Sequence, residues 1–238
     1  MRYFIFLLTI VFLGCQTKEQ SPTSNEILAK SIGIHDPNGN WEKASFSIYI
    51  QEPRVGNAKR FSEVKMNNRE NSFELKRNRD EHISTHIVQK DGKLITYLNG
   101  KVETDSLLIK KYRLQPERNT GYQRFYNVLL GLPMSLQSDG VTVSKDVAET
   151  TFNKEESYKL NIVFNKPLFS KHWNVFIAKK SDKIIGLEMV FPDDPTKGER
   201  LVFEGEFQIT KDIKIPRIRH WRELDDTYAG SDIVLKSL

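Results

Sequence analysis

The sequence contains a single cysteine, Cys15, among its 238 residues. A disulfide bridge needs two cysteines, so internal disulfides are excluded, and so are zinc or iron–sulfur sites built from cysteine clusters. The chain also lacks the patterns G-x-S-x-G, G-x-G-x-x-G, H-E-x-x-H and the phosphate-binding loop, which mark common catalytic and nucleotide sites. The sequence therefore favours a protein that is not an enzyme, and it predicts no cofactor and no metal.

A long hydrophobic run occurs only at the N-terminus, where an apolar stretch over 3–13 follows Arg2. These residues would span roughly 16 Å as a helix, about half of a ~30 Å hydrocarbon core. The stretch therefore suits a signal peptide rather than a membrane-spanning anchor. It ends in Phe12-Leu13-Gly14-Cys15, which resembles a lipobox, the site at which bacterial lipoprotein precursors are acylated on cysteine and cleaved before it.

From this N-terminus we predict a lipoprotein signal peptide over 1–14, then a lipidated tether over 15–22 with the acyl chains on Cys15, and a single domain over 23–238. Each buried CH₂ of an acyl chain contributes about 0.8 kcal/mol, so two or three chains anchor a protein stably. Gln16 resembles the residue that known sorting patterns associate with the outer membrane. We therefore expect a lipid-anchored protein of the bacterial cell envelope, with ordinary secretion as the alternative.

Charge of one sign is not in large excess, because 36 Lys and Arg stand against 31 Asp and Glu. Short basic segments occur at 76–79, 110–113 and 217–219. We interpret them as solvated surface, with attraction to anionic lipid headgroups as the alternative, and an exported protein is not expected to bind nucleic acid. Arg217 and Arg219 would share a strand face with Trp221, which allows a cation–π contact.

Alternating apolar residues predict β-strands in both halves of 23–238, and their even spacing with short turns predicts an antiparallel sheet. Asp91-Gly92 and Asn99-Gly100 are hairpin signals between such strands. The predicted strands are 46–50, 61–66, 73–76, 83–88, 94–98, 146–152, 158–164, 173–179, 184–191, 200–209, 216–222 and 229–236.

Three helices are predicted between and before these strands. Thr23-x-x-Glu26 is a capping box that starts a short N-terminal helix. An apolar stripe of period 3.6 predicts a helix over 122–130, and a weaker helix is predicted over 105–112. We expect the stripe of the 122–130 helix to cover the apolar face of the sheet.

His82 and His86 are a first candidate for a metal site. The β-branched residues around them predict a strand, on which four residues separate the two rings by roughly 13 Å, too far to share one ion. We expect Ile83 and Ile87 to face the core and both histidines to face solvent.

His35-Asp36 beside Trp41 is a second candidate, because a carboxylate next to an imidazole can orient a general base. The interpretation that we favour is structural. Asp36 would hydrogen-bond a turn, and Trp41 would close the end of the sheet.

Several motifs of the mature region occur together: His35-Asp36-Pro37-x-Gly39-x-Trp41, Tyr112-Arg113-Leu114, Phe125-Tyr126-x-x-Leu129-x-Gly131-Leu132-Pro133-Met134, Pro216-Arg217-x-Arg219-x-Trp221 and Gly230-Ser231-Asp232-Ile233. With the lipobox they resemble a family of envelope lipoproteins of unknown function from Bacteroidota-type bacteria. Its layout is similar to that of periplasmic lipoprotein carrier and receptor proteins. The resemblance implies a mainly β (α+β) fold, a curved antiparallel sheet or half-open β-barrel covered by a few short helices, with an apolar concavity that can hold acyl chains.

Two functions follow as hypotheses. The first is a membrane-anchored envelope lipoprotein that binds a lipid or another apolar ligand in the concave face of its sheet. The second is an anchored interaction or scaffolding module without a small-molecule ligand. For the first, we expect the groove to be lined by some of the large apolar residues on the C-terminal strands: Phe164, Trp173, Met189, Phe191, Phe203 and Phe207.

Overall fold

The computed structural model describes residues 21–57 and 59–236, so the predicted signal peptide and Cys15 lie outside the described residues. The described part consists of twelve strands, three α-helices and two 3₁₀ helices. In chain order they are α1 (Ser24–His35), η1 (Trp41–Lys43), β1 (Ser45–Gln51), β2 (Phe61–Asn67), β3 (Ser72–Arg79), β4 (His82–Val88), β5 (Leu94–Leu98), α2 (Ser106–Tyr112), α3 (Arg118–Leu130), η2 (Met134–Gln137), β6 (Val141–Phe152), β7 (Glu155–Leu168), β8 (Ser170–Ala178), β9 (Ile184–Val190), β10 (Gly198–Gln208), β11 (Lys214–Glu223) and β12 (Tyr228–Lys236). All twelve predicted strands are confirmed.

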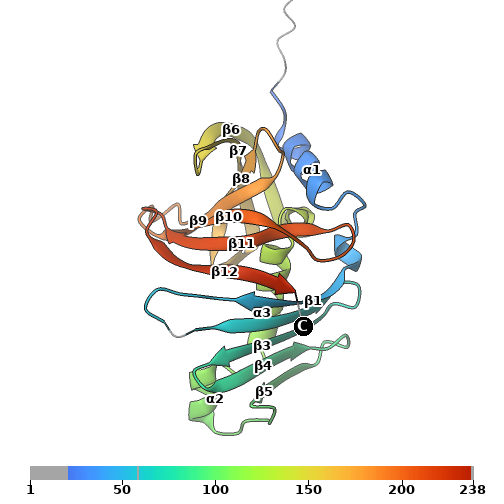
Figure 1. The fold of residues 1–238 in the computed structure, drawn as a ribbon, viewed down its shortest axis with the longest axis vertical. Coiled ribbons are helices and arrows are strands. Elements are labelled where there is room, and N and C mark those ends of the chain that lie inside the picture. Colours follow the sequence, from blue (N-terminus) through green and yellow to red (C-terminus); the bar gives the residue numbers. More distant parts are fainter. Residues whose placement is uncertain (1–20, 58, 237–238) are drawn as a thin grey trace, which may run out of the picture.

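The twelve strands form one antiparallel sheet in the order β5-β4-β3-β2-β1-β12-β11-β10-β9-β8-β7-β6. β1 pairs with β12, with Ile50 opposite Val234, and this pairing joins strands from the two ends of the chain. β5 and β6 are the free edges, so the sheet is open. Figure 1 shows its strong twist, from the steep strands β6–β8 to the nearly horizontal strands β1–β4. The predicted fold, a curved open antiparallel sheet with a few short helices, is confirmed.

The helices lie against one face of the sheet, the inner face. α1 begins at the predicted capping box, whereas α3 begins at Arg118, before the predicted start of its apolar stripe. The Thr23 hydroxyl accepts a hydrogen bond from the Glu26 N–H (3.3 Å), and the Glu26 carboxylate accepts one from the Thr23 N–H (2.8 Å), which completes the capping box of α1. Asp105 caps α2. In Figure 1, α3 lies behind the central strands. Within the described residues, no helix is both long and apolar enough to cross a membrane.

Two hydrophobic clusters fill the inner face, one on each half of the sheet. Trp173 and Leu187 lie in the cluster of the C-terminal strands, and Ile48 and Val64 lie in the cluster of the N-terminal strands. Phe125 of α3 packs against both clusters. The predicted role of this helix is therefore confirmed: its apolar stripe covers the sheet where the two halves meet.

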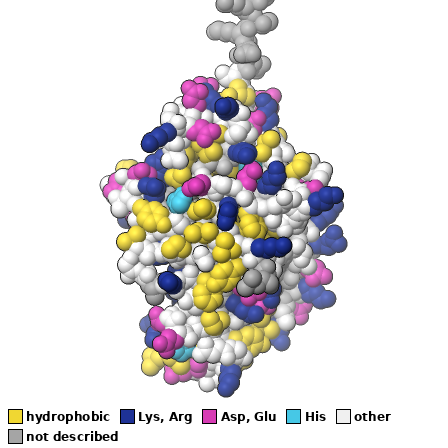
Figure 2. All heavy atoms as spheres, viewed as in Figure 1, with side chains coloured by type: hydrophobic (Ala, Val, Ile, Leu, Met, Phe, Trp, Pro, Cys, Tyr) yellow, Lys and Arg dark blue, Asp and Glu magenta, His cyan; other side chains and the backbone are white. Residues whose placement is uncertain are grey.

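The opposite face of the sheet, the outer face, is shown in Figure 2. Hydrophobic side chains gather in a strip over the middle strands, with Lys, Arg, Asp and Glu around it. On these strands Tyr49 stacks on Phe61 with ring centroids 5.4 Å apart, and Ile218 lies opposite Ile233. All four side chains are half-buried, so the outer face keeps an accessible hydrophobic strip.

Gly186 in β9 occupies a position where an added methyl group has no room. A Cβ there would lie 2.4 Å from the Leu201 carbonyl oxygen and 2.4 Å from the Phe152 ring. Overpacking of this kind costs about 1–3 kcal/mol. We therefore expect Gly186→Ala to lower the free energy of unfolding by about that amount in a urea titration.

Gly33→Ala is the matched control for this substitution, because Gly33 lies in α1 with nothing within 4 Å of the added Cβ. Alanine is favoured over glycine inside a helix by about 1 kcal/mol, so the control is expected to raise the stability. An unchanged stability of Gly186→Ala would contradict the close packing of β9 against Phe152.

Candidate functional site

A row of polar residues crosses the inner face beside the hydrophobic clusters. On β3, Arg77 lies opposite Ser62 of β2 and Ser84 of β4. On β11, Arg219 lies opposite Asp232 of β12. Only 11% of the Arg77 side chain is exposed, and the other four residues are buried. Charged groups are therefore enclosed where the sheet meets α3, and each needs a partner there.

Glu52, directly after β1, is the centre of the first half of this row. Its carboxylate accepts hydrogen bonds from Ser62 Oγ (2.5 Å), Arg77 Nη2 (3.1 Å) and Arg60 Nε. Arg77 also donates to the Tyr126 hydroxyl (2.5 Å), which ties α3 to the sheet. Burial raises the pKa of Glu52, but the two guanidiniums and the serine hydroxyl outweigh it and hold this pKa below its ordinary value.

Asp232 is the centre of the second half of the row. Its carboxylate accepts hydrogen bonds from Arg54 Nη2 (2.5 Å) and from Trp221 Nε1 (2.8 Å). The Arg54 guanidinium lies 5.8 Å from the centre of the Trp221 ring. The cation–π contact expected for this tryptophan therefore exists, but it comes from Arg54, while Arg217 is exposed.

Arg219 is enclosed most completely, with 1% of the residue exposed. Its Nε and Nη2 atoms have no hydrogen-bond partner among the described residues. Burial lowers the pKa of Arg219 to about 10, despite the opposing effect of Asp232, so the guanidinium stays charged at neutral pH. The interpretation of the basic segments as solvated surface is wrong for Arg77 and Arg219, because alternation along a strand turns both toward the inside.

A pocket of about 640 Å³ opens beside the polar row. It lies between α3, the middle strands and the β7–β8 hairpin, and one side of it is hydrophobic: Ile50, Phe125, Leu168, Phe169, Trp221 and Ala229. The polar part of its lining carries more basic than acidic groups: Arg54, Arg60, Arg77, Arg113, Arg118 and Arg124, with Glu52, Glu199 and Asp232. The pocket thus joins an aromatic wall to a positively charged wall.

Phe169 stands at the mouth of this pocket as the single residue between β7 and β8. It is 62% exposed, and its φ of +60° is uncommon for a bulky residue. Its ring centroid lies 5.3 Å from that of Phe125 and 6.4 Å from that of Trp221. Backbone strain of this kind tends to occur at binding sites, and here it holds an exposed aromatic ring over the pocket.

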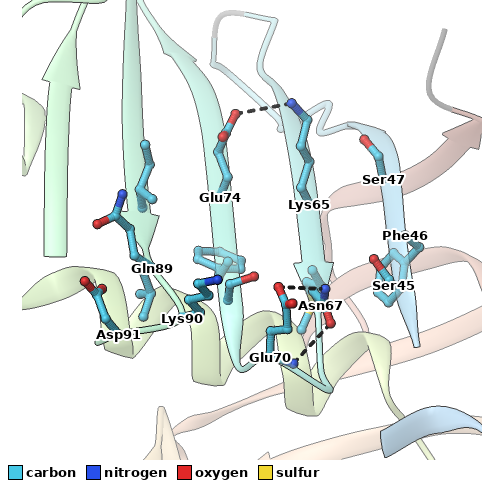
Figure 3. A pocket seen from close by; sticks show the side chains of 15 residues that line it. Ser45, Phe46, Ser47, Lys65, Asn67, Glu70, Glu74, Gln89, Lys90 and Asp91 are labelled. Atoms are coloured by element: carbon cyan, nitrogen blue, oxygen red, sulfur yellow. Dashed lines mark hydrogen bonds and ion pairs between the residues drawn. The ribbon is translucent and has the colours of Figure 1, made fainter. Parts of the chain in front are cut away.

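A larger hollow, of about 810 Å³, lies at the ends of β1–β4 (Figure 3). The polar side chains in it pair with one another: Lys65 contacts Glu74 at 3.4 Å, and Asn67 contacts Glu70 at 3.3 Å. The Lys65 side chain is 46% exposed, and exposed pairs of this kind are worth little. Because the Lys65–Glu74 pair lies on the exposed surface, we assign no ligand to this hollow.

The six residues predicted to line a groove lie outside the 640 Å³ pocket. Four of them pack inside the cluster of the C-terminal strands: Phe164, Trp173, Met189 and Phe203. Phe207 packs at the edge of the other cluster, and Phe191, after the end of β9, is 38% exposed. A groove formed by these residues stays a prediction. The pocket that the structure does contain uses the aromatic residues of α3, the β7–β8 hairpin and β11 instead.

His35 and Asp36 have the structural role that the sequence favoured. The Asp36 carboxylate accepts hydrogen bonds from the N–H groups of Asn40 (2.9 Å) and Trp41 (2.8 Å). His35 is bonded through Nε2 to the Ile184 N–H of β9 (3.3 Å) and through Nδ1 to a carbonyl oxygen of β11 (2.9 Å). Both ring nitrogens are thus occupied by the backbone. Within the described residues, no group of three or more His, Cys, Asp or Glu could hold a metal ion.

His86 is buried, so the prediction that it faces solvent is wrong. It is 1% exposed, its Nδ1 lies 3.0 Å from Asn119 Oδ1 on α3, and its ring lies 4.8 Å from that of Tyr122. The half-buried Ile83 and Ile87 occupy the other face of β4. The prediction failed because polar residues of α3 cover this strand, so its inner face takes histidine rather than isoleucine.

The burial of His86 predicts a loss of stability in acid. Burial lowers the pKa of His86 from 6.5 to about 4, so the neutral ring contributes fully above pH 6.5 and its contribution is lost as the pH falls toward 4. Over this window we expect the free energy of unfolding to fall by about 3 kcal/mol, at up to about 1.4 kcal/mol per pH unit. Urea titrations at several pH values measure this slope.

His86→Gln is expected to flatten the profile between pH 6.5 and 4, because glutamine has no proton to gain. A smaller slope should remain, since burial also lowers the pKa of His35. An identical slope in wild type and His86→Gln would contradict the buried neutral histidine.

The open sheet around α3 and the pocket on its inner face define a class of proteins with a LolA-like fold. A crystal structure of a LolA superfamily protein from Nitrosomonas europaea is similar, with a TM-score of 0.55 and 12% identity, over 92% of this chain and 96% of that chain. A putative outer membrane lipoprotein-sorting protein domain from Vibrio parahaemolyticus has a TM-score of 0.49 and 10% identity, over 87% and 88%. A DUF1329 family protein from Desulfovibrio piger has a TM-score of 0.46 and 9% identity, over 88% of each chain.

The chain belongs to the DUF6503 family, a family of unknown function whose sequence model matches residues 1–235. Among curated proteins, none matches the sequence. The unknown function of the family and the LolA-like fold agree with those two parts of the resemblance found in the sequence motifs. A fold of this kind does not define a function, which depends on the pocket and its residues.

Proposed function

We propose that this protein binds a lipid or a similar ligand with an apolar chain in the pocket between α3, the middle strands and the β7–β8 hairpin. The observation that carries this proposal is the aromatic wall of Phe125, Phe169 and Trp221 around a space of about 640 Å³. Pockets of about 300–1,000 Å³ with mostly apolar walls hold small ligands in many proteins. In the carrier proteins whose layout this sequence resembles, the corresponding concavity can hold acyl chains.

Four of the six residues named from the sequence enter this proposal as the hydrophobic cluster behind the pocket: Phe164, Trp173, Met189 and Phe203. Leu168 and Trp221 line the pocket and belong to the same cluster as Met189 and Phe203. An acyl chain that passes Leu168 would therefore reach these side chains. Methionine suits such a position, because its flexible side chain adapts to irregular apolar groups.

Two exposed phenylalanines test where the ligand binds. The full chain, purified in a maltoside detergent and delipidated, is titrated with a fluorescent fatty acid. Phe169→Ala is expected to weaken saturable binding about tenfold, since an aromatic anchor at a binding site contributes on the order of 1–2 kcal/mol.

Phe191→Ala is the matched control, because Phe191 is also exposed but lies outside the pocket. It is expected to bind like wild type. Weaker binding in Phe191→Ala with normal binding in Phe169→Ala would favour the groove named from the sequence. No saturable binding to wild type would contradict the proposed function.

We further propose that the protein works in the bacterial cell envelope, anchored to the outer membrane through acyl chains on Cys15. This rests on the lipobox-like end of the hydrophobic run and on stable anchoring by two or three chains. Cys15→Ser is expected to leave the membrane fraction or to stay uncleaved, as measured by fractionation and mass spectrometry. Membrane fractionation like wild type, together with a wild-type N-terminus that carries no acyl mass, would contradict the anchor.

The outer face favours a second candidate function, an anchored interaction module. Its hydrophobic strip contains Tyr49 and Phe61 and lies over the middle strands (Figure 2). Accessible hydrophobic patches often mark contacts with other proteins. Loss of a co-purifying protein in Tyr49→Ser/Phe61→Ser, with fatty-acid binding retained, would support this second function.

A further inference from the structure

The charges around the pocket do not balance. Glu52 and Asp232 are occupied by ion pairs with Arg54, Arg60 and Arg77. Three further arginines of the lining have no carboxylate partner within the described residues: Arg113, Arg118 and Arg124. Their charge is therefore available to a ligand.

The partners that these arginines do have are neutral. Arg118 Nε donates to the Gln115 side chain (2.9 Å), and Arg124 donates to the carbonyl oxygens of Lys166 and Pro167. Glu199 is the remaining acid of the lining. Burial and the neighbouring Glu223 raise the pKa of Glu199, which weakens it as a counter-ion.

Two further guanidiniums add positive charge behind this wall. Arg219 on β11 is buried, and its Nε and Nη2 atoms have no hydrogen-bond partner in the described part of the chain. Arg79 on β3 is half-buried: its Nε atom is buried without such a partner, and its Nη2 donates to the Tyr122 hydroxyl (3.4 Å). Burial lowers the pKa of Arg79, and the positive charges of Arg77 and Arg113 add to this shift. Unpaired buried charges cost free energy, and a bound anion would offset part of this cost.

We propose that the polar wall of the pocket is an anion subsite and that the ligand is an amphiphile with a carboxylate or phosphate headgroup. This inference rests on the proposed function and names the chemistry of its ligand. The apolar chain lies against Phe125, Phe169 and Trp221, and the headgroup faces Arg113 and Arg118. Arginine suits both headgroups, because its planar fork donates two parallel hydrogen bonds to a carboxylate or a phosphate.

A pair of matched probes tests the headgroup. The full chain in maltoside detergent is titrated at pH 8 with a fluorescent fatty acid and with its methyl ester, which has the same chain but no charge. We expect the acid to bind about tenfold more tightly than the ester at low salt, and this preference to shrink in about 0.5 M NaCl because salt screens exposed charges.

Removing the free arginines is expected to remove the preference. In Arg113→Gln/Arg118→Gln, acid and ester should bind within about twofold of each other. The matched control is Lys65→Gln/Lys76→Gln, which also removes two positive charges but on an exposed surface outside the pocket. The control is expected to keep the full preference.

The outcomes separate this inference from the proposed function. Equal binding of acid and ester to wild type, or a full preference in the arginine variant, overturns the anion subsite while lipid binding stands. Absence of binding by either probe overturns both. An alkyl phosphate of the same chain length should displace the fatty acid, whereas inorganic phosphate should not. Displacement by inorganic phosphate at equal concentration would show a site for free anions and would contradict the proposal that the ligand is an amphiphile.

Discussion

Replacing Glu52 with glutamine is expected to lower the free energy of unfolding by about 3–5 kcal/mol, because removing one member of a buried ion pair leaves the other charge uncompensated. Only 3% of the Glu52 side chain is exposed, and its partner Arg77 is 11% exposed. Without the carboxylate, Arg77 would keep two neutral partners, the Ser62 hydroxyl (2.8 Å) and the Tyr126 hydroxyl (2.5 Å), and its charge would have no counter-ion. Urea titration at pH 7 measures the loss.

Glu63→Gln is the matched control for this variant. Glu63 also contacts two cations, Lys65 (3.5 Å) and Lys76 (3.9 Å), but its side chain is 33% exposed. Exposed pairs contribute about 0–1 kcal/mol, so the control should change little. Equal losses in Glu52→Gln and Glu63→Gln would contradict a buried charge network.

The Glu52 network also makes the stability of the folded protein depend on pH in acid. The pKa of Glu52 is lower in the folded state than its ordinary value of 4.5, so its contribution is complete above pH 4.5 and is lost as the pH falls through the folded pKa. The window of His86 ends near pH 4, so the two windows overlap only slightly. Glu52→Gln should therefore reduce the acid loss below pH 4.5 and leave the slope above it unchanged.

Asp232→Asn is expected to lower the free energy of unfolding by about 3–5 kcal/mol, because it too removes one member of a buried ion pair. Asp232 lies on β12, next to β1. The carboxylate of Asp232 is the ion-pair partner of Arg54, and it is the acid whose charge favours the ionised form of the fully buried Arg219. An asparagine could still accept the Trp221 hydrogen bond, so the loss reports the charge rather than the packing.

Asp226→Asn is the control for this second variant. Asp226 contacts Arg200 at 3.5 Å and Arg222 at 3.4 Å, with 58% of its side chain exposed. We expect a change within about 1 kcal/mol, measured by the same titration. No loss in Asp232→Asn would show that Arg219 does not depend on the carboxylate. A large loss in Asp226→Asn would contradict the contrast between a buried and an exposed ion pair.

The strands could be predicted well from the sequence, because one buried face makes apolar and polar residues alternate along each strand. Phe46, Ile48 and Ile50 show the period of two that a half-buried strand needs, and β1 contains all three. The capping box of Thr23 and Glu26 likewise acts within one turn of helix. Signals of this kind need no knowledge of distant residues.

The pocket could not be predicted in the same way, because its partners are far apart in the chain. Arg54 meets Asp232 across 178 positions, and Arg77 meets Tyr126 across 49. Glu52 belongs to no motif. One signal was present: on β3 the inner positions change from Phe73 and Leu75 to Arg77, which places an arginine on the same face as the core.

For the six apolar residues named from the sequence, alternation predicted a shared face but not whether that face is open or covered. Phe164, Trp173 and Met189 do share the inner face, as alternation predicts, but each is only 1% exposed. Apolar strand faces usually pack into a dry core, and α3 with its neighbours fills this one. Which part of an inner face stays open depends on where the covering helix ends, and this is a property of the whole fold.

Photo-crosslinking in native membranes tests the lipid pocket most directly. Cells that produce the full chain are grown with a fatty acid carrying a diazirine in its chain and are then irradiated, and the modified peptides are identified by mass spectrometry. A lipid bound in the pocket predicts adducts on α3 and on the β7–β8 hairpin, at Phe125, Leu168 and Phe169. Adducts on the outer face, at Tyr49 or Phe61, with none on α3 or the hairpin, would contradict lipid binding in this pocket.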